Sequence, residues 1–273
     1  MHLQRWLTAI VALPLLLLIL LKGGPWLFLL LAALVCSVGL WELGALLLPA
    51  SGRMLRLETV ALGFLLLAGF ALAPGRAMAA APLLPLMFLA GCLFLLLAGH
   101  LITYGRSPAA LAEMGATALA LLYLPFLLGH LVWLRLLPQG EWWLLWLLLV
   151  IFAGDTGAFY TGRTLGKHKF APKVSPGKTW EGTLGGLLAS LAAGLVLGGR
   201  FLPQVAWGQL LILSLILGVV GVLGDLFESM LKRLAQVKDA SGLLPGHGGI
   251  LDRLDSLVFA GPVVLYFRLL FYP

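Results

Sequence analysis

Residues 142–161, which read WWLLWLLLVIFAGDTGAFYT, combine an apolar run with a polar end. Their number matches the ~20 residues that a helix needs to cross the ~30 Å hydrocarbon core of a bilayer. Asp155 and several hydroxyl side chains stand where the apolar character ends. The stretch therefore predicts a transmembrane helix that carries polar groups toward one membrane surface.

Similar apolar runs recur along the whole chain. Of its 273 residues, 61% are hydrophobic and 11% are charged, whereas a soluble domain carries roughly 25% charged residues. We therefore predict an all-α fold, that of a polytopic integral membrane protein with about nine transmembrane helices. The predicted spans lie near residues 6–21, 26–48, 57–73, 83–103, 115–137, 142–161, 179–198, 207–231 and 254–271.

Three features argue against other classes of protein: the first apolar run against a cleaved secretory signal, the cysteines against a disulfide or zinc protein, and the net charge against a nucleic-acid-binding protein. Arg5 precedes the run, as in a secretory signal, but Lys22-Gly-Gly-Pro25 follows in place of a small-residue cleavage site, so we expect a retained span. Cys36 and Cys92 lack metal-ligand spacing, which argues against a disulfide framework or a zinc site. The net charge of +7 matches anionic headgroups, so membrane lipids and no nucleic acid are the expected partners.

The aspartates are unevenly distributed, since all five lie between positions 155 and 255 and the first 150 residues contain none. An ionisable side chain inside a span costs roughly 2.5–3.5 kcal/mol on insertion scales, so such groups are functional candidates. We expect residues 1–140 to form scaffold helices and residues 141–273 to form a catalytic transmembrane region with cytoplasmic polar loops. Four ionisable residues of the first part lie near predicted helix ends and receive no role: Glu42, His100, Glu113 and His130.

Lysine and arginine predict the orientation. When the spans alternate across the membrane from an inside N-terminus, the basic loops 163–178 and 232–253 fall on the same side. Basic loops mark the cytoplasmic side, and these two loops carry most of the bias. The short chain suggests a bacterial inner membrane, with the active site facing the cytoplasm.

The first polar segment begins at Asp155 and has the composition of a phosphate-binding loop. Its basic side chains include Arg163 and Lys167, which can form charge-assisted hydrogen bonds with phosphate. Ser175-Pro-Gly-Lys-Thr179 is expected to open an apolar helix whose free N–H groups favour phosphate oxygens. It resembles only the tail of a Walker A sequence, and a basic loop with a Ser/Thr helix cap is the alternative.

The second polar segment lies at the end of the predicted span 207–231. At 3.6 residues per turn, four of its polar side chains share one helix face: Asp225, Glu228, Ser229 and Lys232. A carboxylate face suits a hard cation bound through oxygen. The alternative is an ion pair of Asp225 with Lys232 or Arg233 that only packs helices.

The third polar segment contains a turn and two carboxylates. Pro245-Gly-His247-Gly-Gly allows positive φ and a close approach of the backbone to a ligand. Asp252 and Asp255 follow at three-residue spacing on one face of the last span. Because two neighbouring carboxylates repel each other, a metal ion or an arginine is expected to compensate them.

The two C-terminal segments together resemble the signature of the phosphatidate cytidylyltransferase family, also called CDP-diacylglycerol synthase. The residues that carry the resemblance are Ser229-Met-Leu-Lys232-Arg233, Lys238-Asp239 and Pro245-Gly-His-Gly-Gly-Ile-Leu-Asp252-Arg253-Leu-Asp255. Asp155-Thr-Gly-Ala and Ser175-Pro-Gly-Lys-Thr are similar to the family in the expected order. The departures are the order of Phe159 and Tyr160 and the presence of Ala240.

This resemblance implies transfer of the cytidylyl group from CTP to phosphatidate, which gives CDP-diacylglycerol and pyrophosphate. Catalytic roles are then expected for Asp225, Asp252, Lys178 and Arg253. Asp225 and Asp252 would hold Mg²⁺, either one ion or a two-metal pair with Asp255 or Asp155 assisting. No nucleophilic side chain is needed, because the lipid phosphate attacks. A monovalent cation such as K⁺ is also implied.

A wider set of residues is expected to bind the anionic substrates. The candidates for CTP or the phosphatidate headgroup are Ser175, Lys178, Thr179, Arg163, Lys167, Lys232, Arg233, Lys238, Asp239 and His247. A phosphate monoester is already largely ionised at neutral pH, so His247 is expected to donate a hydrogen bond or shape the turn. The family also makes a homodimer plausible.

Three other functions compete with this reading. A CTP-dependent lipid kinase would transfer the γ-phosphate to a polyprenol or phytol, but the full downstream signature argues against it. The helix pattern of a CDP-alcohol phosphotransferase is absent. A transporter would place Asp155, Asp225 and Asp252 on an ion path, which the absence of an internal repeat and the adjoining basic loops oppose.

Overall fold

The computed structural model describes residues 13–48, 52–76, 81–243 and 248–272, and most of these are helical. Eight helical segments in this part of the chain are long and apolar enough to cross a membrane. Residues 13–21 form a further helix, and the start of the predicted first span lies outside the described residues. The all-α, polytopic membrane fold is thereby confirmed.

The chain forms two compact units, each described here by itself. Unit 1 comprises Met1–Leu137 and Asp239–Leu251, and unit 2 comprises Pro138–Lys238 and Asp252–Pro273. The described helices of unit 1 are α2 (Pro25–Leu47), α3 (Arg53–Ala71), α4 (Leu83–Ile102), α5 (Ala110–Leu121), the π-helix η1 (Leu122–Phe126) and α6 (Leu127–Leu136). The expected division of roles at residue 140 stays a prediction.

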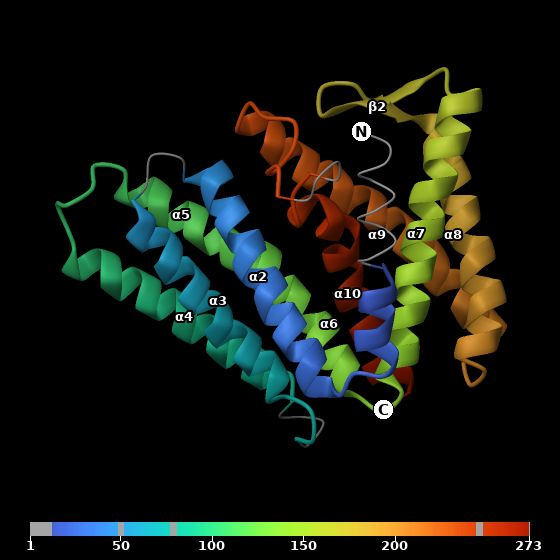
Figure 1. Cartoon of the computed structure of the whole chain (residues 1–273), viewed down its shortest axis with the longest axis horizontal. Coiled ribbons are helices and arrows are strands. Elements are labelled where there is room, and N and C mark those ends of the chain that lie inside the picture. The colour runs from blue at the N-terminus through green and yellow to red at the C-terminus, as the bar shows by residue number, and fades with distance from the viewer. Residues whose placement is uncertain (1–12, 49–51, 77–80, 244–247, 273) are drawn as a thin grey trace. The chain divides into compact units, whose positions relative to one another are not determined.

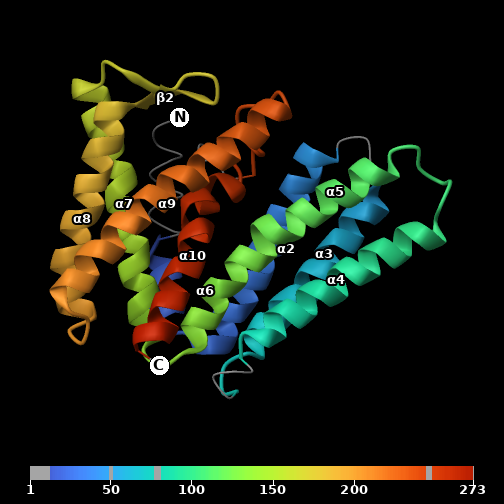
Figure 2. The same cartoon turned by 180° about the vertical axis from the view of Figure 1, so that it is seen from behind.

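A π-helical turn joins α5 to α6 and makes one long span of unit 1 (Figure 2). Pro125 lies in this turn, where a proline that lacks an N–H can be accommodated by a change of helical register. Next to it, Phe126 packs edge-on against Phe70 of α3 with 5.5 Å between the ring centroids. Aromatic packing therefore attaches the bent span to its neighbour.

Unit 2 contains α7 (Gly140–Leu165), β1 (Lys169–Ala171), β2 (Ser175–Thr179), α8 (Trp180–Phe201), α9 (Trp207–Leu234) and α10 (Leu251–Phe271), the last from its second residue onward. Helices α7 and α8 run side by side, and the β1–β2 hairpin connects them at one end (Figure 1). The unit thus places the hairpin at the same end as the polar parts of α7 and α9.

Small residues let α7 and α8 approach closely. Gly182, Gly186, Ser190 and Gly194 are buried at four-residue intervals along α8, a spacing that brings helix backbones together in membranes. A Cβ atom on Gly186 would lie 2.9 Å from the carbonyl oxygen of Gly154. Ser190 Oγ also donates to the carbonyl of Val150 over 3.1 Å. This contact fixes Asp155 of α7 beside the start of α8.

The hairpin between α7 and α8 differs from the sequence expectation. Ser175–Thr179 is a strand paired antiparallel with β1, so the prediction that this stretch opens a helix with free N–H groups is wrong. Pro176 explains the difference, because the residue before a proline is driven to an extended conformation. The alternative of a capped helix is confirmed, since Thr179 is the N-cap of α8 and its Oγ1 accepts the Gly182 N–H over 3.1 Å.

Helices α7 and α9 are longer than the predicted spans, with 26 and 28 residues. At 1.5 Å per residue they measure about 39 and 42 Å, which exceeds the ~30 Å hydrocarbon core. Their last turns carry Arg163 on α7 and Lys232 and Arg233 on α9. The extra turns therefore carry basic side chains beyond the length that the hydrocarbon core requires.

Candidate active site

A lysine of the hairpin reaches the acidic face of α9. Lys178 Nζ lies 2.8 Å from Asp225 Oδ2, and the side chains of the pair are 20% and 35% exposed. The expected alternative, an ion pair of Asp225 with Lys232 or Arg233, is not the one formed. The strand β2 accounts for this, because it carries Lys178 from the hairpin to Asp225, the first residue of the α9 acidic face.

Lys232 joins two carboxylates from different helices. Its Nζ lies 2.6 Å from Glu228 Oε2 and 2.5 Å from Asp252 Oδ1. The side chains are almost fully enclosed, with 12% of Lys232, 1% of Glu228 and 7% of Asp252 exposed. Ion pairs so poorly solvated are stable only while every charge keeps its partner. This triad ties the end of α9 to the start of α10.

The predicted common face of α9 is confirmed by its side-chain contacts. Ser229 Oγ donates to Asp225 Oδ1 over 3.3 Å, and Lys232 donates to Glu228 one turn further on. Both contacts have the four-residue spacing of one helix face. Asp225 is therefore held by two donors, Ser229 from its own helix and Lys178 from β2.

Two further aspartates approach Asp225 from neighbouring helices. Asp155 of α7 interacts electrostatically with Asp225, Lys178 and Arg253, and Asp255 of α10 interacts with Asp225 and Asp155. Within the described residues, neither Asp155 nor Asp255 has a direct ion-pair partner. Three helices of unit 2 thus bring together carboxylates that are widely separated in the sequence.

We call this group the acidic cluster. It consists of five carboxylates and three basic side chains linked by the contacts above: Asp155, Asp225, Glu228, Asp252 and Asp255, with Lys178, Lys232 and Arg253. By formal charge, five carboxylates against three basic side chains leave an excess of two negative charges. Carboxylate oxygens and this formal excess suit a hard divalent cation.

The carboxylates that the structure describes differ in their partners. Across the described residues, no group of three or more histidine, cysteine or acidic side chains converges on one point. Asp225 and Asp252, for which the sequence most strongly implied metal binding, are each paired with a lysine. Asp155 and Asp255 are the carboxylates without a direct cationic partner among the described residues. The ligand set stays a prediction.

A glycine allows α9 and α10 to meet at the acidic cluster. A Cβ atom on Gly224 would collide with the backbone carbonyl of Asp255 and lie 3.1 Å from the Cα of Ser256. One turn earlier, the carbonyl of Gly221 accepts a hydrogen bond from Ser256 Oγ over 3.0 Å. The missing side chain therefore sets the distance between the carboxylates of Asp225 and Asp255.

Gly224→Ala is expected to lower both stability and activity, because α9 and α10 must separate to admit the methyl group. Overpacking of this kind costs about 1–3 kcal/mol, and the carboxylates of Asp225 and Asp255 would move apart. Thermal unfolding in detergent and initial rates measure the two effects. Gly208→Ala is the matched control on the same helix, since a Cβ atom there meets no atom within 4 Å. Equal behaviour of the two variants would contradict the packing argument.

The remaining predicted binding residues are not members of the acidic cluster. Arg233 donates from Nε to the carbonyl of Val174 over 3.2 Å and so attaches α9 to the hairpin. His247 lies outside the described residues. Four others are exposed, and their binding roles stay predictions: Arg163, Lys167, Lys238 and Asp239. Ser175 lies in β2, and its binding role stays a prediction.

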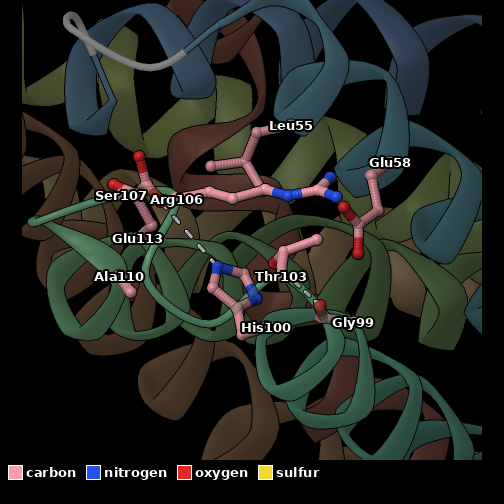
Figure 3. Close-up of a pocket in the computed structure, with 9 residues that line it drawn as sticks. All are labelled: Leu55, Glu58, Gly99, His100, Thr103, Arg106, Ser107, Ala110 and Glu113. Atoms are coloured by element: carbon pink, nitrogen blue, oxygen red, sulfur yellow. Dashed lines mark hydrogen bonds and ion pairs between the residues drawn. The ribbon is translucent and has the colours of Figure 1, made fainter.

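Two groups that received no role from the sequence have defined surroundings. His100 and Glu113 line a pocket of unit 1 with 3.9 Å between His100 Nε2 and Glu113 Oε2 (Figure 3). Glu42 of α2 is buried, and its carboxylate accepts hydrogen bonds from Ser241, Ile250 and Leu251. The only sequence signal for Glu42 was an ionisable side chain within an apolar run.

Comparison with known proteins identifies a family over most of the sequence and individual relatives over about half of it. A model of the cytidylyltransferase family matches residues 3–271. A phosphatidate cytidylyltransferase from Haemophilus influenzae is 46% identical over 134 residues, which is 47% of this chain and 46% of the relative. The enzyme of Staphylococcus saprophyticus is 48% identical over 46% of this chain and 48% of the relative. The enzyme of Bacillus subtilis is 42% identical over 48% of this chain and 49% of the relative. The chain thus covers about half the length of the curated relatives it matches.

Proposed function

We propose, from the premise that this chain belongs to the cytidylyltransferase family, that it transfers the cytidylyl group of CTP to phosphatidate. The products are CDP-diacylglycerol and pyrophosphate, which makes the chain a nucleotidyltransferase of phospholipid biosynthesis. The relatives are phosphatidate cytidylyltransferases, which supports these substrates. The observation that carries the proposal is the acidic cluster, where lysines from β2 and α9 meet aspartates from α9 and α10.

The chemistry requires two anions to meet. An oxygen of the phosphatidate phosphate attacks the α-phosphorus of CTP, the bond from that phosphorus to the bridging oxygen breaks, and pyrophosphate leaves. Because the nucleophile is the substrate's own ionised phosphate, positioning and neutralisation of charge supply most of the rate acceleration. The basic side chains of the acidic cluster are suited to this task. They are Lys178, Lys232 and Arg253, and the phosphate groups of the substrates must compete with the neighbouring carboxylates for them.

We also propose that the acidic cluster holds Mg²⁺. Asp225 and Asp252 would be its ligands, with Asp155 or Asp255 assisting, and the excess of carboxylates over basic side chains supports a divalent ion. When bound, Mg²⁺ would neutralise charge on the phosphate oxygens. A second Mg²⁺ ion or a monovalent cation such as K⁺ is part of the same proposal.

The membrane interface suits the two substrates. Phosphatidate keeps its acyl chains in lipid while its headgroup must reach CTP in water. The long helices α7 and α9 carry basic side chains into the interface beside the hairpin, and basic loops favour the cytoplasmic side. We propose that the active site faces the cytoplasm from a bacterial inner membrane, in a chain that works as a homodimer.

Purified protein supplied with CTP, phosphatidate and Mg²⁺ is expected to release pyrophosphate and to form CDP-diacylglycerol. Release should require the lipid and stop when a chelator removes the metal. Separation of the lipid products distinguishes this activity from that of a CTP-dependent kinase, which would give a phosphorylated lipid alcohol and CDP. A folded wild-type protein that makes no CDP-lipid in lipid-containing micelles would rule out the proposed function.

A further inference from the structure

Glu42 of α2 is a buried carboxylate whose partners all come from one distant segment. Only 5% of the residue is exposed. Its Oε1 accepts a hydrogen bond from Ser241 Oγ over 2.5 Å and another from the Ile250 N–H over 3.1 Å. Its Oε2 accepts from the Leu251 N–H over 3.0 Å. Ser241, Ile250 and Leu251, in the described part of the segment 241–251, are therefore held by a carboxylate about 200 positions earlier in the chain.

Two glycines shape this segment around the carboxylate. Gly248 has a φ of 78°, which a residue with a side chain rarely adopts. A Cβ atom on Gly249 would lie 2.7 Å from both carboxylate oxygens of Glu42, so a larger residue there would displace the carboxylate from its present position. The sequence led us to expect that these glycines let the backbone approach a ligand. In the structure, the group that Gly249 approaches is a side chain of the protein itself.

The hydrogen bonds of Glu42 end where the catalytic part of α10 begins. Leu251 is the first residue of α10, and Asp252 and Arg253 follow it directly. The first N–H groups of a helix have no partner within the helix, and a carboxylate placed there accepts them and complements the helix dipole. Glu42 therefore determines where the first turn of α10 starts.

We infer that Glu42 is a positioning residue for the proposed cytidylyl transfer: by holding the Leu251 N–H and the segment before it, it sets the placement of Asp252 and Arg253. The inference rests on the proposed function, since it concerns the same reaction. Glu42 touches neither substrate nor the reacting atoms in this role. It acts through the backbone that precedes Asp252.

The chemistry of the contact selects the informative variants. Glu42→Gln keeps the size of the side chain but replaces one acceptor oxygen by an NH₂ group, which cannot accept the N–H and hydroxyl groups around it. Glu42→Asp keeps the charge and both acceptors on a side chain shorter by one methylene. Ser241→Ala removes the hydroxyl that donates to Glu42 and accepts the Leu243 N–H. It leaves both backbone hydrogen bonds to the carboxylate in place, so it tests the same contact with a small disturbance of folding.

Glu42→Gln is expected to lower kcat by about 100-fold, the effect of misplacing a catalytic group by about 1 Å, while KM for CTP stays unchanged. Glu42→Asp should restore part of kcat, and Ser241→Ala should lower it less than Glu42→Gln. Glu113→Gln is the matched control, a carboxylate-to-amide change in the pocket of unit 1, and should leave kcat and KM unchanged. A residue needed only for folding would reduce the yield of active protein without lowering the kcat of the folded fraction.

Amide hydrogen exchange provides a readout that does not depend on activity. In Glu42→Gln, exchange at Ile250 and Leu251 should become faster, while peptides from α3 and α4 keep the wild-type rate. Unchanged exchange at these amides, or an unchanged kcat in a folded variant, overturns the positioning role. A wild-type protein that makes no CDP-lipid overturns the proposed function instead, and the exchange rates then still decide whether Glu42 holds the segment.

Discussion

Asp225→Asn and Asp252→Asn are each expected to lower lipid-dependent pyrophosphate release by about 10³-fold, the upper range for loss of one group that stabilises charge in a transition state. Each change removes a negative charge that pairs with a lysine, Lys178 or Lys232, and an oxygen ligand proposed for Mg²⁺. Both effects should appear in kcat. Initial rates at saturating CTP, measured over a range of Mg²⁺ concentrations, provide the test.

A matched control separates loss of chemistry from loss of structure. Glu141→Gln changes a carboxylate to an amide in the first turn of α7, more than three helical turns before Asp155, and should keep the wild-type rate. If Asp225→Asn and Asp252→Asn also kept it, the acidic cluster could not be the active site. If higher Mg²⁺ concentrations restored the rate of either variant, its aspartate would act mainly by binding the metal.

Lys232→Met is expected to destabilise the protein by about 3–5 kcal/mol, because it leaves Glu228 and Asp252 as neighbouring buried carboxylates without their shared cation. For a chain of this length the apparent Tm should fall by about 10 °C or more. Activity should be lost as well, since Asp252 loses the partner 2.5 Å away. Thermal unfolding in detergent and pyrophosphate release measure the two losses.

The reason for this destabilisation can be tested by removing the unpaired charges. In the triple variant Lys232→Met, Glu228→Gln, Asp252→Asn no carboxylate of the triad remains, so stability should largely return while activity stays absent. A triple variant as unstable as Lys232→Met would show that packing of the lysine stem, and not charge balance, supports this part of α9. Recovered activity would contradict the catalytic assignment of Asp252.

The contrast between Asp225 and Asp252 has a chemical consequence. Asp225 is 35% exposed and Asp252 is 7% exposed at the side chain, so water and ions reach them to different extents. An exposed carboxylate exchanges its lysine for a cation at little desolvation cost, whereas an enclosed one needs its compensating charge throughout. Asp225 is thus the better placed of the two to receive an incoming ion.

The membrane fold and the chemical composition of the site could be predicted from local sequence. Apolar runs of about 20 residues specify spans wherever they occur, because the bilayer acts on each helix separately. The helical spacing of Asp225, Glu228, Ser229 and Lys232 predicted their common face in the same way. The signature between Ser229 and Asp255 identified the family, which the match over residues 3–271 confirms.

Other features depend on contacts between distant segments. Pro176 turns the stretch before α8 into a strand, and only the paired hairpin directs Lys178 to Asp225. Lys232 has partners on two helices. Glu228 lies one turn before it on α9, and Asp252 lies 20 positions after it on α10. No local pattern encodes such a choice, because a charge pairs with whichever partner packing brings within reach.

Glu42 illustrates the same division between what local sequence decides and what tertiary structure decides. From the sequence alone it was an ionisable residue near a predicted helix end, and it received no role. Which helix end it serves was decided by tertiary structure, which brings the start of α10 to α2 within unit 1. The sequence by itself determined the spans and the reactive groups, because hydropathy and helical periodicity are local. The pairing of those groups required the folded chain, because electrostatic and hydrogen-bonding partners are chosen by distance in space.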